Sequence, residues 1–210
     1  MLDQWTIQWI RPPIEKTAIL LNSKGIRPDQ VTLAGFLIGL TAIPLLAWQC
    51  YVTSLVMILL NRIMDGIDGA LARLQQPTDA GGFLDITLDF IFYSSVVLGF
   101  AVADPSRNAI AANFLLFSFV GTSASFLAYG IMAEKNCLTH PQFAYKSLYY
   151  LGGLAEGTET ILFFTVSCLM PAYFPVLAFS FSFICMITTI SRIWTGYKTI
   201  KSSANKVFIR

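Results

Sequence analysis

Charged side chains are scarce in this sequence. They make up 12% of its residues, whereas about 25% is usual for a soluble domain. Four long stretches contain no charged residue at all: residues 30–61, 90–103, 108–133 and 160–191. A helix needs about 20 mostly apolar residues to cross a bilayer. The sequence therefore predicts membrane-spanning helices and excludes an ordinary soluble domain.

Paired cysteines, histidine clusters and basic stripes are also missing. The single histidine, His140, and the four cysteines at positions 50, 137, 168 and 185 lack the spacing of metal or redox sites. The formal net charge is only +2, so we do not expect a nucleic acid as partner. The N-terminus carries charges and a Pro12–Pro13 pair where a cleavable signal peptide would have an unbroken apolar core.

We expect an all-α, polytopic membrane protein that forms one domain over residues 1–210. Residues 1–24 predict an amphipathic helix on the membrane surface, because Ile14, Ala18 and Leu21 share one helical face. Six spans are expected within residues 28–200. They run approximately over residues 29–48, 52–74, 80–103, 108–134, 154–170 and 175–197.

The lysines and arginines predict the orientation of these spans. Only Arg107 lies in the connections near residues 49, 106 and 171–175. Most other basic residues lie at the opposite ends of the spans or in the terminal segments, and basic residues favour the cytoplasmic side. We therefore expect both termini, and the turn between the second and third spans, to face the cytoplasm.

Five of the twelve acidic residues lie in residues 65–89, and all five are aspartates; the segment also holds one arginine. Asp65 and Asp68 are three residues apart, and Asp85 and Asp89 are four apart, so each pair shares a helix face. A short turn through Pro77 joins the two helices as antiparallel neighbours. The four carboxylates can therefore converge on one cluster at the cytoplasmic end of the bundle.

Four converging carboxylates repel one another unless a cation lies between them. Hard divalent cations with oxygen ligands, Mg²⁺ or Mn²⁺, are the natural partners, and two of them can clamp a pyrophosphate. Small residues beside the aspartates, among them Gly81 and Gly82, leave room for a bulky group. Arg73 can pair with a phosphate, and Thr78 or Asp79 is expected to cap the third span.

This motif resembles the signature of the CDP-alcohol phosphatidyltransferase family, D-x2-D-G-x2-A-R, then seven or eight residues, then G-x3-D-x3-D. Every fixed position of that signature is matched here. The matching residues are Asp65, Asp68, Gly69, Ala72, Arg73, Gly81, Asp85 and Asp89. The length, the six expected spans and the entry helix also fit the family, so the resemblance covers the whole chain.

The resemblance implies a role for each matching residue. It implies that Asp65, Asp68 and Asp85 hold two divalent metals, and that Asp89 joins the second metal and is the catalytic base. The residues implied to contact the CDP-lipid are Asp29, Thr32, Gly69, Ala72, Arg73, Thr78 and Gly81. Asp29 and Thr32 correspond to a P-N-x-x-T segment of the family, with aspartate here in place of asparagine.

Other charged residues are candidates for binding the acceptor alcohol. Basic residues near the cytoplasmic ends of the spans could bind an acceptor phosphate, whereas two glutamates that begin the fifth span could hydrogen-bond a polyol or an amine. The structural alternative for the lysines is that they anchor the ends of the spans at the membrane surface. For the glutamates it is that they lie near a helix N-terminus, where negative charge is favourable. The acceptor candidates are Arg62, Lys135, Lys146, Glu156, Glu159 and Arg192.

We therefore expect an enzyme that transfers a phosphatidyl group from CDP-diacylglycerol to a small hydroxyl acceptor and releases CMP. Glycerol 3-phosphate or a polyol phosphate is the preferred acceptor, while serine and free polyols stay open. The resemblance implies a homodimer, and the short loops suggest a bacterial inner-membrane member. One alternative is a phosphotransferase that moves a CDP-linked headgroup to diacylglycerol. A cation transporter is the alternative from another class, although no inverted repeat is evident.

Overall fold

The computed structural model describes residues 3–136 and 153–207, and every regular element in this part of the chain is helical. The expected all-α fold is confirmed. The elements, in chain order, are α1 (Asp3–Ser23), α2 (Pro28–Leu40), α3 (Ala42–Ala47), α4 (Tyr51–Gln75), α5 (Asp79–Ala103), α6 (Pro105–Lys135), α7 (Gly157–Leu169), the 3₁₀ turn η1 (Pro171–Tyr173) and α8 (Phe174–Val207).

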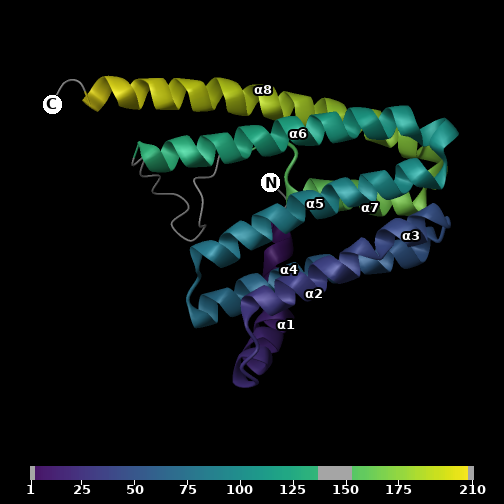
Figure 1. Cartoon of the computed structure of the whole chain (residues 1–210), viewed down its shortest axis with the longest axis horizontal. Coiled ribbons are helices and arrows are strands. Elements are labelled where there is room, and N and C mark those ends of the chain that lie inside the picture. The colour runs from purple at the N-terminus through teal and green to yellow at the C-terminus, as the bar shows by residue number, and fades with distance from the viewer. Residues whose placement is uncertain (1–2, 137–152, 208–210) are drawn as a thin grey trace.

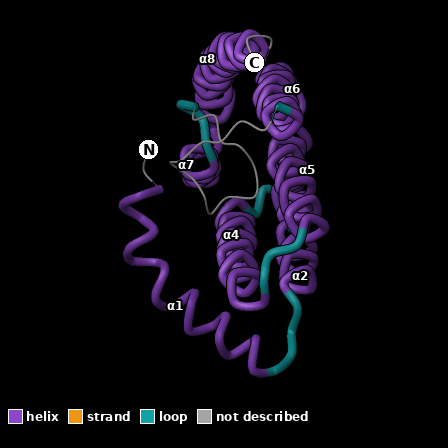
Figure 2. Tube along the Cα trace, turned by 90° about the vertical axis from the view of Figure 1, so that its left-hand side faces the viewer, coloured by secondary structure: helices purple, strands orange, loops and turns teal. Residues whose placement is uncertain are grey.

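The helices from α2 to α8 form an elongated bundle with a common long axis (Figure 1). Figure 2 looks along this axis, so that α2, α4, α5, α6, α7 and α8 are seen nearly end-on, with α1 running across them outside the bundle. Contacts between α6 and α8, between α2 and α4, and between α3 and α5 hold the bundle together. Its interior is rich in phenylalanine, with Phe100 stacked on Phe174 at 4.4 Å between ring centroids.

Four segments of the described chain are long and apolar enough to cross a membrane. They are Pro28–Ala47, Asp79–Ala103, Pro105–Lys135 and Pro171–Ser202. The helix α4 has a similar length but carries the charged motif, and α7 spans 13 residues. The protein is therefore a polytopic membrane protein, while the count of six spans and the single domain over residues 1–210 stay predictions.

The first expected span, residues 29–48, is not one continuous helix. It divides at Thr41 into α2 and α3. Pro44 has no N–H to donate to the carbonyl four residues earlier, which interrupts the hydrogen-bond ladder of the helix. The backbone N–H of Thr41 instead bonds to the carbonyl of Ile38 at 3.1 Å, as in a tighter turn.

The apolar face expected on the first helix packs against protein. Ala18 is fully buried, and Ile14 and Leu21 are partly buried beside it. Their partners are Val31 of α2 and three residues of α4, Ile67, Ala70 and Leu71. The surface helix α1 thus rests on the helix that carries the first half of the aspartate motif.

Two contacts fix the ends of the motif helices. Thr78 caps α5, as expected, by accepting a hydrogen bond from the backbone N–H of Gly81 at 3.1 Å. Gln75, the last residue of α4, donates from Nε2 to Asn22 Oδ1 and to the carbonyl of Ile26, both at 2.8 Å. The turn between α1 and α2 is thereby tied to the end of α4 that bears Arg73.

Candidate functional site

Three of the four motif aspartates lie together. Asp65 and Asp68 extend from α4 and Asp85 extends from α5, and one carboxylate oxygen of each lies within 4.8 Å of the others. These three residues, with Thr32, Asn61, Arg62 and Asp89 among the others, line a narrow cavity of about 10 Å³. We call Asp65, Asp68 and Asp85 the aspartate cluster.

The aspartate cluster has the chemistry that a divalent cation requires. All of its donor atoms are carboxylate oxygens, which Mg²⁺ and Mn²⁺ prefer. Asp68 is only 5% exposed, and its Oδ2 atom has no hydrogen-bond partner among the described residues. A buried carboxylate oxygen without a donor is costly, and a cation would satisfy it. The cavity has about the space of one water molecule, which also suits a single ion.

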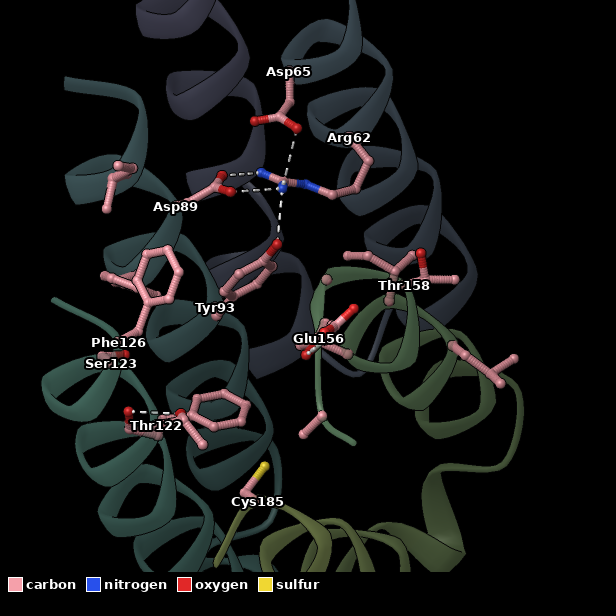
Figure 3. A pocket seen from close by; sticks show the side chains of 18 of the residues that line it. Arg62, Asp65, Asp89, Tyr93, Thr122, Ser123, Phe126, Glu156, Thr158 and Cys185 are labelled. Carbon is pink, nitrogen blue, oxygen red and sulfur yellow. Dashed lines mark hydrogen bonds and ion pairs between the residues drawn. The ribbon is translucent and has the colours of Figure 1, made fainter. Parts of the chain in front are cut away.

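Asp89 stands beside this cluster but is held by Arg62. The guanidinium donates from Nη2 to Asp89 Oδ1 at 2.5 Å and from Nη1 to Asp89 Oδ2 at 3.2 Å, a two-point ion pair. Arg62 Nη1 also lies 3.6 Å from Asp65 Oδ2. Figure 3 shows Arg62 between Asp65 and Asp89, with Tyr93 beneath it. One arginine therefore contacts an aspartate from each half of the motif.

The other donors of Arg62 are engaged by protein as well. Nε and Nη2 both donate to Asn61 Oδ1, at 2.9 and 2.7 Å, and Nη1 donates to the Tyr93 hydroxyl at 3.0 Å. Asn61 is itself fixed, because its Nδ2 donates to the carbonyl of Gly35 at 2.9 Å. The guanidinium also lies over the Phe92 ring, at 4.9 Å from its centroid. All three nitrogens of the guanidinium thus donate to protein acceptors.

A larger cavity of about 760 Å³ opens on the other side of the Arg62–Asp89 pair. Arg62, Asp65 and Asp89 line both cavities. The walls come from α4, α5, α6, α7 and α8, and they carry hydroxyl, aromatic and charged side chains (Figure 3). The polar and aromatic lining residues include Tyr93, Thr122, Ser123, Phe126, Glu156, Thr158, Thr160 and Arg192.

The structure brings some of the acceptor candidates together and separates others. Arg62, Glu156 and Arg192 all line the larger cavity, whereas Lys135 lies exposed in the last turn of α6, outside this lining. Glu159 lies in the first turn of α7 and is also absent from the lining. Lys146 lies outside the described residues.

Arg192 lines this cavity and is buried, with 7% of its surface exposed. Its Nη1 donates to the carbonyl of Thr122 at 3.3 Å, and its guanidinium lies 5.6 Å from the centroid of the Phe126 ring. Glu156 precedes α7, and its Oε1 accepts from the backbone N–H of Gly153 at 3.0 Å. A cation from α8 and a carboxylate from the residue before α7 therefore line one cavity.

The residues expected to contact the CDP-lipid lie at the N-terminal ends of α2 and α5 and near the C-terminal end of α4. Asp29 and Thr78 adjoin Gly81, where an added Cβ would come within 3.1 Å of both Asp29 Oδ1 and Thr78 Oγ1. Arg73 lies over Gly69, with Nη1 3.6 Å from the position of an added Cβ. Thr32 lines the narrow cavity beside the aspartates, and Ala72 is half-buried on α4.

Sequence reasoning missed Asn61 and Tyr93. Asn61 directly precedes Arg62 and is a polar residue within an apolar run, and Tyr93 follows Asp89 by four residues on the same face of α5. Both positions can be noticed in the sequence, but nothing in it indicates that the two side chains accept hydrogen bonds from the same guanidinium, that of Arg62. Thr122, Ser123 and Thr158 gave no local signal, because single hydroxyl residues are common in membrane helices.

Comparisons with known proteins identify a family and several relatives. Residues 26–194 match the CDP-alcohol phosphatidyltransferase family. The chain is 52% identical to the inner membrane protein YnjF of Escherichia coli K12, over 96% of this chain and 98% of that protein. It is 32% identical to an archaetidylinositol phosphate synthase of Pyrococcus horikoshii, over 53% of this chain and 60% of that enzyme.

A similar fold occurs in the phosphatidylinositol phosphate synthase of Mycobacterium tuberculosis. Its structure in complex with manganese and citrate has a TM-score of 0.70 and 23% identity, covering 88% of each chain. This likeness shows the fold, and the match over residues 26–194 together with the relative of 52% identity shows the family. The chain therefore belongs to the CDP-alcohol phosphatidyltransferase family and is a membrane-embedded, metal-dependent transferase of phospholipid biosynthesis.

Proposed function

We propose that this enzyme transfers a phosphatidyl group from CDP-diacylglycerol to a polyol phosphate or glycerol 3-phosphate and releases CMP. The main observation in support is that two cavities lie on either side of the Arg62–Asp89 pair. The aspartate cluster lies on one side of this pair, and a cavity of about 760 Å³ that contains Arg192 lies on the other. A reaction that joins two substrates at one phosphorus needs such a pair of neighbouring sites.

Asp65, Asp68 and Asp85 are the proposed holders of one Mg²⁺ or Mn²⁺ in the narrow cavity. A second metal would be held with Asp89, where this residue borders the larger cavity. When bound, such cations neutralise the pyrophosphate and stabilise its entering and leaving oxygens. Arg73 pairs with a phosphate of the donor, and Thr32, Gly69, Ala72, Thr78 and Gly81 form the walls of the CDP pocket with Asp29. Gly69 and Gly81 lack side chains where Arg73 and Asp29 approach, so backbone is accessible there.

Asp89 is the proposed base, because its carboxylate borders both cavities. It takes the proton of the acceptor hydroxyl, whose oxygen forms a bond to the phosphorus next to the lipid. The bond from that phosphorus to the CMP oxygen breaks, and CMP leaves with the electron pair and the negative charge. Arg73 lies at the end of α4 where it can hold that charge.

Arg192 and Glu156 are the proposed acceptor ligands, because both enter the larger cavity from its walls. A guanidinium suits a phosphate, and a carboxylate accepts hydrogen bonds from hydroxyls. The relative from Pyrococcus horikoshii is named an archaetidylinositol phosphate synthase, and the structural neighbour is a phosphatidylinositol phosphate synthase, also solved with CDP-DAG bound. These names support a polyol phosphate acceptor and a CDP-diacylglycerol donor. Lys135, Lys146 and Glu159 stay secondary candidates.

The proposed location is the bacterial inner membrane, with the motif and both termini in the cytoplasm. The relative from Escherichia coli is named an inner membrane protein. The turn between α4 and α5 lies at the end of the bundle where α6 and α8 finish (Figure 1). Lys135, Lys198 and Lys201 lie toward that end, as the preference of basic residues for the cytoplasmic side requires. We propose a homodimer from the family resemblance.

The decisive experiment is CMP release by the purified protein with CDP-diacylglycerol and Mg²⁺ or Mn²⁺. The acceptor panel contains glycerol 3-phosphate, inositol phosphate, serine and unphosphorylated polyols. An Asp89→Asn variant runs beside the wild type, with Asp79→Asn as the control because Asp79 is an exposed residue in the first turn of α5.

We expect release that requires a divalent cation and a phosphorylated polyol, is lost in Asp89→Asn and persists in Asp79→Asn. Release with serine or free polyols alone would contradict the proposed acceptor class. Release from a CDP-linked headgroup with diacylglycerol as acceptor, and none from CDP-diacylglycerol, would reverse the roles of lipid and headgroup.

A further inference from the structure

Arg62 has no N–H donor left for a substrate. A guanidinium carries five N–H groups, one on Nε and two on each terminal nitrogen. The structure has one hydrogen bond from Nε, two from Nη1 and two from Nη2. Their acceptors are Asn61, Asp89 and Tyr93, so the expected role of Arg62 as a ligand of the acceptor phosphate competes with five protein contacts.

We propose that Arg62 is a positioning residue, which holds the carboxylate of Asp89 at the boundary of the two cavities in competition with a divalent cation at the aspartate cluster. This inference rests on the proposed function in taking Asp89 as the base. Arg62 then acts through Asp89 and touches neither the donor nor the acceptor.

The frame around Arg62 is built to orient Asp89. Asn61 is 4% exposed and is fixed to the backbone of α2 through Gly35, so it fixes one edge of the guanidinium plane. Phe92 and Tyr93 of α5 hold the flat face, with centroids 4.9 and 5.1 Å from the guanidinium carbon. The remaining edge presents two parallel donors to the Asp89 carboxylate, which fixes its plane as well as its place.

This geometry affects the reaction through the position of the base. A base is effective when its oxygen lies within hydrogen-bonding reach of the acceptor hydroxyl, and Asp89 borders the cavity proposed for that acceptor. Without Arg62 the carboxylate can rotate toward the aspartate cluster or into the cavity. A misplacement of about 1 Å can reduce the rate about 100-fold, while the binding of the acceptor itself is unaffected.

Arg62 also sets the charge near the aspartate cluster. Its Nη1 lies 3.6 Å from Asp65 Oδ2, and Arg62 and Asp65 side chains are 14% and 35% exposed. A cation bound by Asp65 is repelled by this arginine and must also compete with it for Asp89. Removing the positive charge should therefore strengthen cation binding while it weakens catalysis. A residue needed only for folding would not separate the two effects.

The test compares Arg62→Gln, Arg62→Lys and Arg192→Gln with the wild type in detergent. The measurements are kcat and acceptor KM from CMP release, and the Kd of Mn²⁺ from the electron paramagnetic resonance signal of the free ion. We expect Arg62→Gln to lower kcat about 100-fold, to leave the acceptor KM within about twofold and to tighten Mn²⁺ binding at least about tenfold.

The lysine variant separates charge from geometry. Lysine keeps the positive charge but cannot offer a planar two-point contact. Arg62→Lys should therefore leave the Kd of Mn²⁺ close to the wild-type value and still lose most of kcat. The Arg192→Gln control should raise the acceptor KM about tenfold or more without changing the Kd of Mn²⁺. If Arg62→Gln does not fold, the kinetic comparison is made between Arg62→Lys and Arg192→Gln.

A raised acceptor KM in both Arg62 variants, with unchanged Mn²⁺ affinity, would overturn the proposal and make Arg62 an acceptor ligand. Wild-type kcat and Kd in Arg62→Gln would overturn it too. Failure of the proposed function is a different result: the wild type would release no CMP with any acceptor. The Kd of Mn²⁺ in Arg62→Gln would then still decide whether Arg62 competes with the cation.

Discussion

Ile14 occupies the space that a side chain at residue 66 would need. A Cβ added to Gly66 would come within 2.8 Å of Ile14 Cδ1. Gly66 directly follows Asp65 in α4, and Ile14 belongs to α1, so the surface helix touches the motif helix one residue from a proposed metal ligand. The helices α1 and α4 therefore pack closely at Gly66, and a side chain at this position would have to displace the end of Ile14.

The substitution Gly66→Ala tests this link between α1 and α4. Overpacking costs about 1–3 kcal/mol, while alanine in place of glycine gains about 1 kcal/mol of helix propensity. We expect a net loss of stability of up to about 2 kcal/mol, which lowers the apparent melting temperature by roughly 2–4 °C per kcal/mol. Thermal unfolding in detergent measures it.

The control is the double variant Ile14→Ala with Gly66→Ala. Once Ile14 is shortened, the alanine at position 66 has room, and its helix propensity should make it stabilising relative to Ile14→Ala alone. The sign of the Gly66→Ala effect should therefore reverse between the two backgrounds, as in a double-mutant cycle. An equal effect in both would show that Ile14 and Gly66 are not coupled.

The aspartate cluster predicts a sharp loss of cation binding in Asp68→Asn. Asp68 is the most buried member of the cluster and has an oxygen without a hydrogen-bond partner in the described chain. Removal of this charge should weaken Mn²⁺ binding by about 100-fold or more, because hard cations need carboxylate ligands. Titration of Mn²⁺ into the chelator-treated protein measures it, and restored turnover on adding Mn²⁺ back reports the intact site.

Asp79→Asn is the matched control for this measurement. Asp79 belongs to the same motif region and to the first turn of α5, but it is exposed and lies outside the aspartate cluster. The Mn²⁺ affinity of the Asp79→Asn protein should equal that of the wild type. If both variants lose Mn²⁺ to the same extent, the cation responds to the overall negative charge of this region and not to the cluster.

The helices and the motif could be predicted from the sequence because their signals are local. Apolar runs, helix periodicity and turn residues placed most elements within three residues of their observed bounds, whereas α8 continues to Val207, ten residues beyond the expected end at residue 197. The spacing of Asp65, Asp68 and Asp85 put their carboxylates on facing sides of two adjacent helices, and the structure brings them together. The family signature pointed to the same residues.

The contacts of Arg62 and the partner of α1 could not be predicted in this way. Arg62 and Asp89 are 27 residues apart, and their pairing depends on helix rotation and side-chain rotamers that no spacing reveals. The apolar face of Ile14, Ala18 and Leu21 was visible, but lipid and protein satisfy such a face equally well. The interruption at Thr41 had a visible cause in Pro44, although proline in a span does not always divide a helix.

Replacement of Glu156 should weaken the binding of the acceptor and leave the binding of CDP-diacylglycerol unchanged. The Oε1 atom of Glu156 accepts a hydrogen bond from Gly153 N–H, and its side chain borders the larger cavity. Glu156→Gln should raise the acceptor KM about tenfold and leave the KM of CDP-diacylglycerol unchanged, as steady-state kinetics would show. Glu134→Gln, an exposed change in the last turn of α6, should alter neither constant. Equal KM values in all three proteins would remove Glu156 from the acceptor site.

Thiol labelling of Cys50 would report the orientation of the enzyme in the membrane. This residue lies exposed in the turn between α3 and α4, at the opposite end of the bundle from the turn between α4 and α5 (Figure 1). If the motif faces the cytoplasm, Cys50 faces the periplasm. In a Cys137→Ser background, a membrane-impermeant maleimide should label Cys50 in cells whose outer membrane has been opened.

The matched variant moves the thiol to the other side. A protein with Cys137→Ser, Cys50→Ser and Asp79→Cys carries its accessible thiol in the first turn of α5, where residue 79 is exposed. This thiol should react only after the inner membrane is broken, since the two buried cysteines, Cys168 and Cys185, are shielded in both proteins. The reverse pattern, with position 79 labelled first, would put the aspartate cluster on the periplasmic side. The headgroup of CDP-diacylglycerol in the cytoplasmic leaflet would then be out of its reach.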